Sequence, residues 1–195
     1  MDIKKSLLLN KIPKIKLKRL TIYLLIFVFA PIFTYITGKK LDNLFSLPSF
    51  PSYPYNLIFG MMVFLGGLAI GIKSTRLLYQ IGKGLPWGEI SHDDRSKRLV
   101  TTGLYAYSRN PMTFGYSMLP CGMGMMFQSL GMAVFITTLV FIINILWLKM
   151  IEEPKLEKRF GETYSKYRRK TPFLIPRVNP LKILSLLRND KTESS

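Results

Sequence analysis

Four stretches of the chain contain no Asp, Glu, Lys or Arg: residues 20–38, 56–72, 111–127 and 129–148. Each has about 17 or more residues, the length at which an apolar helix crosses the hydrocarbon of a bilayer. The last two meet at Gln128 and Ser129, which predicts a tight antiparallel hairpin over residues 111–148. The pattern predicts an all-α, polytopic membrane helix bundle of about four transmembrane helices.

The remaining segments differ from these stretches in pattern. Residues 1–19 alternate Lys with Ile and Leu, which is typical of a segment lying on an anionic membrane surface. We therefore divide the chain into a basic interfacial segment (1–19), two N-terminal transmembrane helices (20–79), a region around the hairpin (80–178) and a basic tail (179–195). After the hairpin, Pro154 predicts the start of a new helix folded over the membrane surface. Leu156, Phe160, Tyr164 and Tyr167 would share one face of it, and Gly161 would pack closely.

Composition and charge support a membrane rather than a soluble fold. Apolar residues make up 48% of the chain although its net charge is +17, a combination that lipid and its anionic headgroups accommodate. Nucleic acid is disfavoured as a partner, because a protein that binds nucleic acid does not require long uncharged runs. Basic residues gather in 1–19, in 73–109 and from Lys155 onward, whereas residues 39–55 carry only Lys39 and Lys40 against Asp42. This asymmetry predicts cytoplasmic termini on a multi-pass integral membrane protein.

Other isolated features suggest packing rather than chemistry. Cys121 is the only cysteine, and we interpret it as a small packing residue. His92 beside Asp93 and Asp94 is a poor ligand set, so we predict no metal site there. The Gly67-x-x-x-Gly71 spacing favours close packing within the chain over dimerisation. The oligomeric state is left open.

Two polar clusters border the hairpin. Residues 97–111 lead into its first helix, and Glu152 and Glu153 leave its second. Since the helices are antiparallel, both clusters should reach the same cytoplasmic surface. Arg109 could form an ion pair with Glu152 or Glu153 that only closes the bundle, or the clusters could form a ligand site. The residues alone leave both interpretations open.

At these clusters the chain resembles a known family. The motif reads Leu99-Val100-x-x-Gly103-x-Tyr105-x-Tyr107-x-Arg109-Asn110-Pro111-Met112, followed after the hairpin by Glu152-Glu153-x-x-Leu156-x-x-x-Phe160-Gly161-x-x-Tyr164-x-x-Tyr167. In order and spacing it is similar to the isoprenylcysteine carboxyl methyltransferase family, integral membrane enzymes related to phospholipid methyltransferases. The resemblance covers residues 80–178, including the segments 82–86 and 171–176 at its two ends.

The resemblance implies an S-adenosylmethionine-dependent methyltransferase with cytoplasmic cofactor-binding segments. The acceptor would be lipophilic or small, for example an isoprenylcysteine-like carboxylate, a thiol or a lipid amine. The implied cofactor contacts are Lys97, Arg98, Leu99, Val100, Tyr105, Asn110, Pro111, Met112, Thr113 and Glu152. The catalytic candidates are Arg109, Glu153 and Tyr107, of which Glu153 or Tyr107 could take the proton of an amine acceptor.

Some positions depart from the eukaryotic prenylcysteine enzymes. Asn110 replaces a His, Thr113 replaces a Tyr, and Leu148 replaces an Arg that contacts the substrate carboxylate, which leaves Lys149 as a possible point charge. The Arg-Asn-Pro form is similar to that of prokaryotic members, which indicates a prokaryotic cytoplasmic membrane. Two other functions stay open, an NADPH-dependent membrane reductase of the sterol-reductase type and a non-catalytic membrane partner protein.

Overall fold

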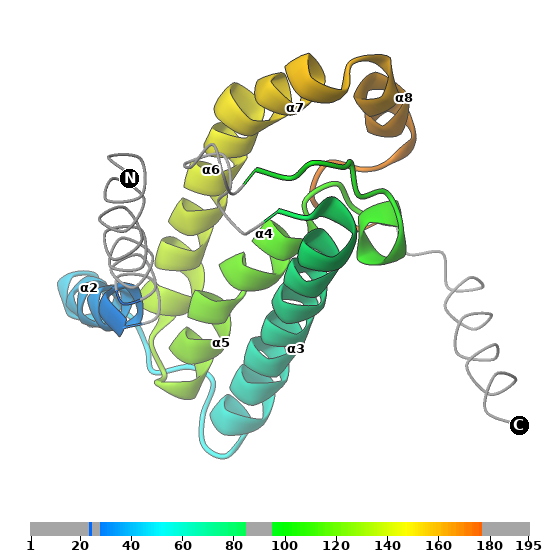
Figure 1. Ribbon diagram of the computed structural model, residues 1–195. Helices are drawn as coiled ribbons and strands as arrows, with labels where there is room; N and C mark the ends of the chain where they lie inside the picture. The colour runs from blue at the N-terminus through cyan, green and yellow to red at the C-terminus, as the bar shows by residue number, and fades with distance from the viewer. Residues whose placement is uncertain (1–23, 25–27, 85–94, 177–195) are drawn as a thin grey trace, which may run out of the picture. The chain divides into compact units, whose positions relative to one another are not determined.

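The computed structural model describes residues 24, 28–84 and 95–176, and the regular elements in these ranges are all helices (Figure 1). The chain forms two compact units, one of Met1–Gly60 and Pro120–Ile136, the other of Met61–Leu119 and Thr137–Ser195. The predicted interfacial segment 1–19 and the basic tail 179–195 lie outside the described residues. The same holds for most of the first half of the predicted span 20–38 and for His92.

The first unit packs α2 (Ala30–Leu44) against the π-helical turn η5 (Gly131–Ile136). Gly38 permits a close approach, because a Cβ atom at this position would lie 2.6 Å from Cβ of Met132. The helix continues to Leu44, so the predicted end at residue 38 is wrong. The polar residues beyond Gly38 stay helical because they find partners: Lys39 donates to the Phe127 carbonyl at 3.0 Å, and Asp42 accepts from the Gly131 amide at 2.7 Å.

The same unit contains α5 (Leu119–Met126) and the turn that joins it to η5. Gln128 adopts a φ of 52°, and the Ser129 amide donates to the Gly124 carbonyl at 2.8 Å. The Ser129 hydroxyl then accepts from the Met132 amide at 3.1 Å. The predicted tight turn at Gln128 and Ser129 is therefore confirmed.

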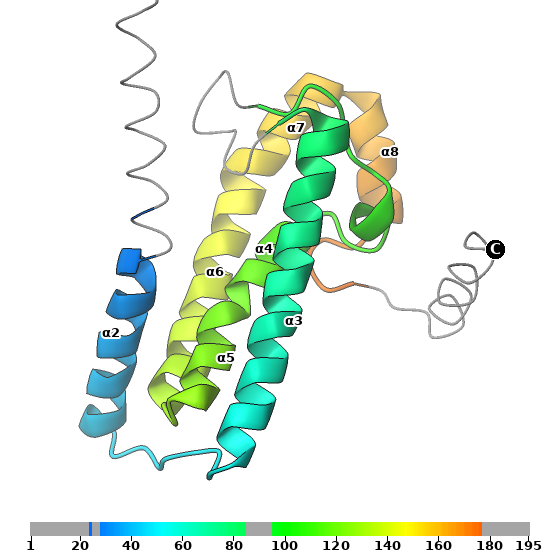
Figure 2. The same ribbon diagram turned by 60° about the horizontal axis from the view of Figure 1, so that its bottom comes forward.

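In the second unit, α4 (Pro111–Ser117) lies between α3 (Tyr55–Leu77) and α6 (Thr137–Trp147) (Figure 2). A Cβ atom on Gly67 would lie 2.7 Å from the Gly115 carbonyl oxygen, and one on Gly71 would meet the ring of Tyr116 at 2.6 Å. The interpretation of the Gly67 and Gly71 spacing as packing within the chain is confirmed.

Two helices of the described part are long and apolar enough to cross a membrane. They are Tyr55–Gly82, which continues α3 through the π-helical turn η2 (Leu78–Gly82), and Gly131–Phe160, with mean hydropathies of 1.9 and 2.3. The predicted span 111–127 is instead divided into α4 and α5 around Met118, since Pro120 lacks the amide hydrogen needed to continue the helix. The number of four spans stays a prediction.

The segment after the hairpin differs from its prediction. Helix α6 continues through the π-helical turn η6 (Leu148–Glu152) into α7 (Glu153–Phe160), and α8 (Glu162–Lys170) turns away from its end (Figure 1). Gly161 separates α7 from α8 with a φ of +53°, a conformation that favours glycine. A Cβ atom there would meet nothing within 4 Å. The expected single helix and the close packing of Gly161 are therefore wrong.

Candidate functional site

A cavity lies in the second unit, where the two polar clusters that border the hairpin were expected to meet. The volume of the cavity is about 110 Å³, and the cavity is open on one side. Its lining combines aliphatic, aromatic and charged side chains: Leu78, Ser96, Arg98, Leu99, Val100, Tyr105, Arg109, Asn110, Met112, Thr113, Asn144, Trp147, Leu148, Glu152, Leu156, Tyr164 and Tyr167.

One wall is the segment between η2 and α4. The Gly82 carbonyl at the end of η2 accepts from the amides of Lys97 and Arg98, at 2.7 and 3.2 Å. The absence of a side chain at Gly82 leaves room for Val100, since a Cβ atom would lie 3.1 Å from its methyl group. The 3₁₀ turn η4 (Gly103–Ala106) then buries the Tyr105 side chain. These contacts hold the Leu99 and Val100 region against the cavity.

The opposite wall is one face of the continuous helix through α6, η6 and α7. Asn144, Leu148, Glu152 and Leu156 recur every four residues and all line the cavity, as side chains on one helical face do. Trp147 lies beside them. Glu152 and the cluster at residues 98–113 thus border the same space, although they are far apart in sequence.

Three tyrosines close the cavity near α8. The Tyr167 hydroxyl donates to the Tyr105 carbonyl at 2.6 Å, and Tyr164 is almost completely buried. Burial raises the pKa of all three phenols, and the negative charges of Glu152 and Glu153 raise the pKa of Tyr105 and Tyr164 further. These phenols therefore remain protonated and can donate hydrogen bonds well into the alkaline range.

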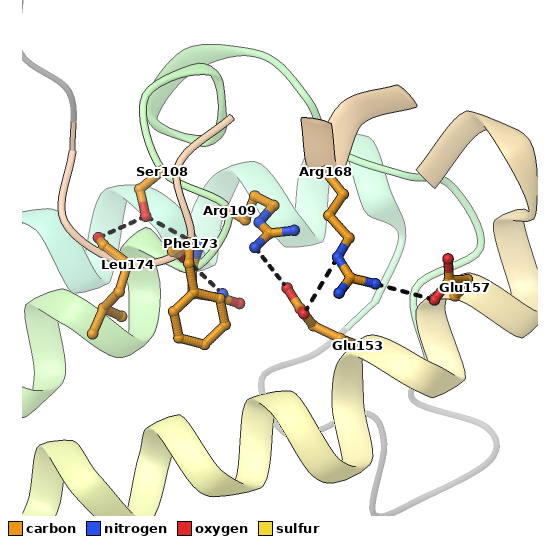
Figure 3. A network of polar contacts seen from close by, with 8 residues as sticks. Ser108, Arg109, Glu153, Glu157, Arg168, Phe173 and Leu174 are labelled. Carbon is orange, nitrogen blue, oxygen red and sulfur yellow. Dashed lines mark hydrogen bonds and ion pairs between the residues drawn. The ribbon is translucent and has the colours of Figure 1, made fainter. Parts of the chain in front are cut away.

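Beside the cavity lies a buried ion pair (Figure 3). Nη2 of Arg109 is 3.1 Å from Oε1 of Glu153, and only 10% and 8% of these side chains are exposed. Arg168 joins Glu153 to Glu157, at 3.9 and 3.3 Å. Nε and Nη1 of Arg109 have no hydrogen-bond partner among the described residues. Arg109 therefore keeps buried donor capacity at the cavity wall.

Residues 172–174, which we call the C-terminal strap, hold Arg109 from the other side (Figure 3). The Ser108 hydroxyl donates to the Leu174 carbonyl at 2.8 Å, and the Arg109 amide donates to the Pro172 carbonyl at 2.9 Å. The Phe173 ring lies 5.5 Å from the Arg109 guanidinium and 5.3 Å from the Lys149 ammonium. The strap thus fixes the orientation of a residue that lines the cavity.

Most of the predicted site residues lie on the cavity wall: Arg98, Leu99, Val100, Tyr105, Arg109, Asn110, Met112, Thr113 and Glu152. Four do not line it. Pro111 starts α4, Tyr107 ends η4, Lys97 bonds to Gly82 through its backbone, and Glu153 pairs with Arg109. Asn110 lines the cavity, but its side-chain amide donates to the Phe173 carbonyl at 2.9 Å, so this donor is used by the strap.

Other lining residues were not predicted to form the site. Tyr164 and Tyr167 were placed on a helical face without a ligand role, and Asn144 and Trp147 were treated as part of an apolar span. The sequence could have identified Asn144 as a candidate, because an amide within hydrocarbon needs a partner. Among the described residues, no group of three or more His, Cys, Asp or Glu side chains is placed to hold a metal ion.

The fold and the cavity define an integral membrane protein with a mixed aromatic and charged site beside its apolar helices. The sequence model of the phospholipid methyltransferase family matches residues 55–163. The chain therefore belongs to this family, and the resemblance found in the motifs is confirmed.

Two known proteins extend the comparison. The protein-S-isoprenylcysteine O-methyltransferase of Schizosaccharomyces pombe is 31% identical over 150 residues, which cover 72% of this chain and 61% of that protein. A solved structure of the eukaryotic intramembrane Ras methyltransferase, an isoprenylcysteine carboxyl methyltransferase, is 19% identical and superposes with a TM-score of 0.54 over 78% of this chain and 52% of its own. This second likeness shows the fold alone. The chain spans about three fifths of the length of the yeast relative.

Proposed function

We propose that the chain is an S-adenosylmethionine-dependent methyltransferase and that the cavity beside Glu152 holds the cofactor. Membership of the phospholipid methyltransferase family and the similarity to an O-methyltransferase support the reaction class. The observation that carries the proposal is the shared cavity of Glu152 and residues 98–113. The methyl acceptor is a lipophilic or small molecule that enters from the bilayer.

The residues on the cavity wall fit this cofactor chemically. Leu99, Val100 and Tyr105 offer apolar and aromatic surface suited to a purine. The Glu152 carboxylate can accept hydrogen bonds from sugar hydroxyls or an ammonium group. Arg109 also lines the cavity, where its positive charge favours a carboxylate. A Gly-x-Gly-x-x-Gly loop, the usual solution in soluble nucleotide-binding folds, does not occur in the sequence.

The cavity wall suits methyl transfer through positioning and exclusion of water. S-adenosylmethionine, when bound, would supply a methyl group on a positively charged sulfur. The aromatic side chains of Tyr105, Trp147 and Tyr164 surround the space and limit water around the reacting atoms. Glu152 and Arg109 would hold the polar ends of the ligands, so that donor and acceptor meet in one orientation.

A base is needed only for some acceptors. A thiolate, carboxylate or phenolate can attack directly, whereas an amine must lose a proton. We proposed Glu153 and Tyr107 for that proton, but neither side chain lines the cavity, and Glu153 is paired with Arg109. The geometry is therefore best suited to an acceptor that needs no strong base.

The proposal is tested with the purified protein in lipid vesicles. Incubation with methyl-labelled S-adenosylmethionine and an extract of lipids and thiols should yield a labelled product that mass spectrometry identifies. Glu152→Gln should reduce labelling at least tenfold, and the exposed Glu162→Gln should not. Absence of any labelled product with the native protein, in extracts rich in each acceptor class, would contradict the proposal.

A further inference from the structure

Asn144 is a polar residue in the most apolar part of the chain. It lies in α6 (Thr137–Trp147), within the helix Gly131–Phe160 whose mean hydropathy is 2.3. An amide in such a helix is costly unless it is paired or faces a ligand. Asn144 also lines the cavity. Its contacts show which atom of the amide is paired within the protein and which is left for a ligand.

The hydrogen bonds of Asn144 fix the orientation of its amide. Nδ2 donates to the Val140 carbonyl at 2.9 Å and to the Ser117 hydroxyl at 3.3 Å. Because a carbonyl can only accept, the nitrogen and not the oxygen must face Val140. Both amide hydrogens are then used. Oδ1 receives no hydrogen bond from any described residue, yet it is not among the enclosed atoms that lack partners, so it keeps accessible surface.

Asn144 lies at the end of the cavity that is deeper in the apolar helix. It precedes Glu152 by two helical turns, or roughly 12 Å along the axis. The implied cofactor contacts gather around Glu152 and residues 98–113. Asn144 therefore lines the part of the cavity that lies nearer the apolar middle of the helix than Glu152 does.

We propose that Oδ1 of Asn144 selects a lipophilic ligand that carries an N–H or O–H donor at its head. A ligand without such a donor would leave the oxygen unpaired in a medium that offers no water. Ser117 is a positioning residue in this arrangement, because its buried hydroxyl helps to hold the amide. The inference rests on the proposed function in taking this ligand to be the methyl acceptor, and the donor that Asn144 recognises is then a different group from the atom that is methylated.

Trp147, one turn from Asn144 on the cavity wall, provides a direct readout. The protein with Trp87→Phe keeps Trp147 as its only tryptophan and is placed in phosphatidylcholine vesicles. Two probes are compared, 2-bromohexadecan-1-ol and its methyl ether, whose bromine quenches nearby indole fluorescence. The ether lacks the hydroxyl donor and carries one additional methyl group. Since one hydrogen bond changes affinity roughly three- to tenfold, the alcohol should quench at a correspondingly lower concentration than the ether.

Variants then assign this preference to Asn144. Asn144→Leu should bring the two probes to equal potency, whereas Asn144→Asp, which keeps an acceptor, should retain the preference for the alcohol. Ser117→Ala should reduce the preference partly. Quenching of Trp147 by probe dissolved in the bulk lipid is the same in all variants, so a difference between variants reports on binding near Asn144.

Equal quenching by both probes in the native protein would overturn the inference and needs no variant to interpret. A preference for the alcohol that survives in folded Asn144→Leu would overturn it as well. Affinity for S-adenosylhomocysteine is measured on the same samples and should stay within about twofold in Asn144→Leu, because the residue lies away from Glu152. Loss of that affinity would show that Asn144 serves the cofactor instead. Absence of the affinity in the native protein, with the alcohol preference intact, would reject the proposed function alone.

Discussion

Glu152 and Glu153 are adjacent in the chain but face different surroundings. Glu152 lines the cavity, whereas Glu153 is buried against Arg109. Successive side chains on a helix diverge by about 100°, so one carboxylate can serve a ligand while its neighbour stabilises the fold. The sequence could not assign the two functions, because the assignment depends on the register of the helix through η6.

Glu153→Gln should destabilise the protein more than Glu152→Gln does. Loss of the Glu153 charge leaves the buried Arg109 guanidinium uncompensated, which costs about 3–5 kcal/mol. Thermal unfolding in detergent measures this difference. Glu152→Gln should unfold close to the native temperature but bind S-adenosylhomocysteine at least tenfold more weakly, because charge-assisted hydrogen bonds are lost. The reverse assignment of stability and affinity would contradict this account.

The buried tyrosines predict a specific alkaline response. Their pKa is raised by burial in the folded protein, whereas in the unfolded chain it is about 10. The stability they contribute is complete below pH 10 and is lost as the pH rises from there toward the raised pKa. Tyr167→Phe should flatten the fall of the unfolding temperature between about pH 10 and 11. An unchanged slope would show that Tyr167 ionises in the folded state as it does in the unfolded chain.

Among the elements, the C-terminal strap has the clearest supporting function. It is held by Ser108, by the Arg109 amide and by the side chain of Asn110. Ser108→Ala removes a buried donor and leaves the Leu174 carbonyl unpaired, which costs about 1–3 kcal/mol. Hydrogen exchange of the Arg109 amide, which donates to the Pro172 carbonyl, should become faster. The exposed Thr163→Ala is the control, and equal exchange in both variants would argue against a strap held by Ser108.

The contact between α3 and α4 gives a matched pair of adjacent glycines. Gly67→Ala should be strongly destabilising, because its Cβ would lie 2.7 Å from the Gly115 carbonyl oxygen. Gly66→Ala meets nothing within 4 Å and should be neutral or stabilise by up to about 1 kcal/mol through helix propensity. Thermal unfolding compares them. Equal effects of the two substitutions would contradict the packing of α4 on α3.

At the level of elements, the sequence predicted the features that depend on the length of apolar runs and on turn residues. The hairpin turn at Gln128 and the glycine contact at Gly67 follow from local composition. The end of α2 at Leu44 and the break at Gly161 depend on tertiary partners or on one backbone conformation. An uncharged run ends at the first charge, whereas a helix ends where its backbone groups find other partners.

At the scale of the whole molecule, the motif on either side of the hairpin predicted residues that line one cavity, among them Arg98, Thr113 and Glu152. What the motif could not supply was the other lining, such as Asn144 and Trp147. These residues come from helices that were interpreted as spans, and a span pattern does not distinguish a side chain that faces lipid from one that faces a cavity. Only the packing of α4 against α6 makes that distinction.

The central claim is that this cavity binds S-adenosylmethionine, and equilibrium binding to the purified native protein tests it most directly. S-adenosylhomocysteine should bind saturably, with an affinity that falls at least tenfold in Glu152→Gln and is unchanged in Glu162→Gln, while NADPH should not bind. Saturable binding of NADPH without any of S-adenosylhomocysteine would contradict the claim and favour a membrane reductase.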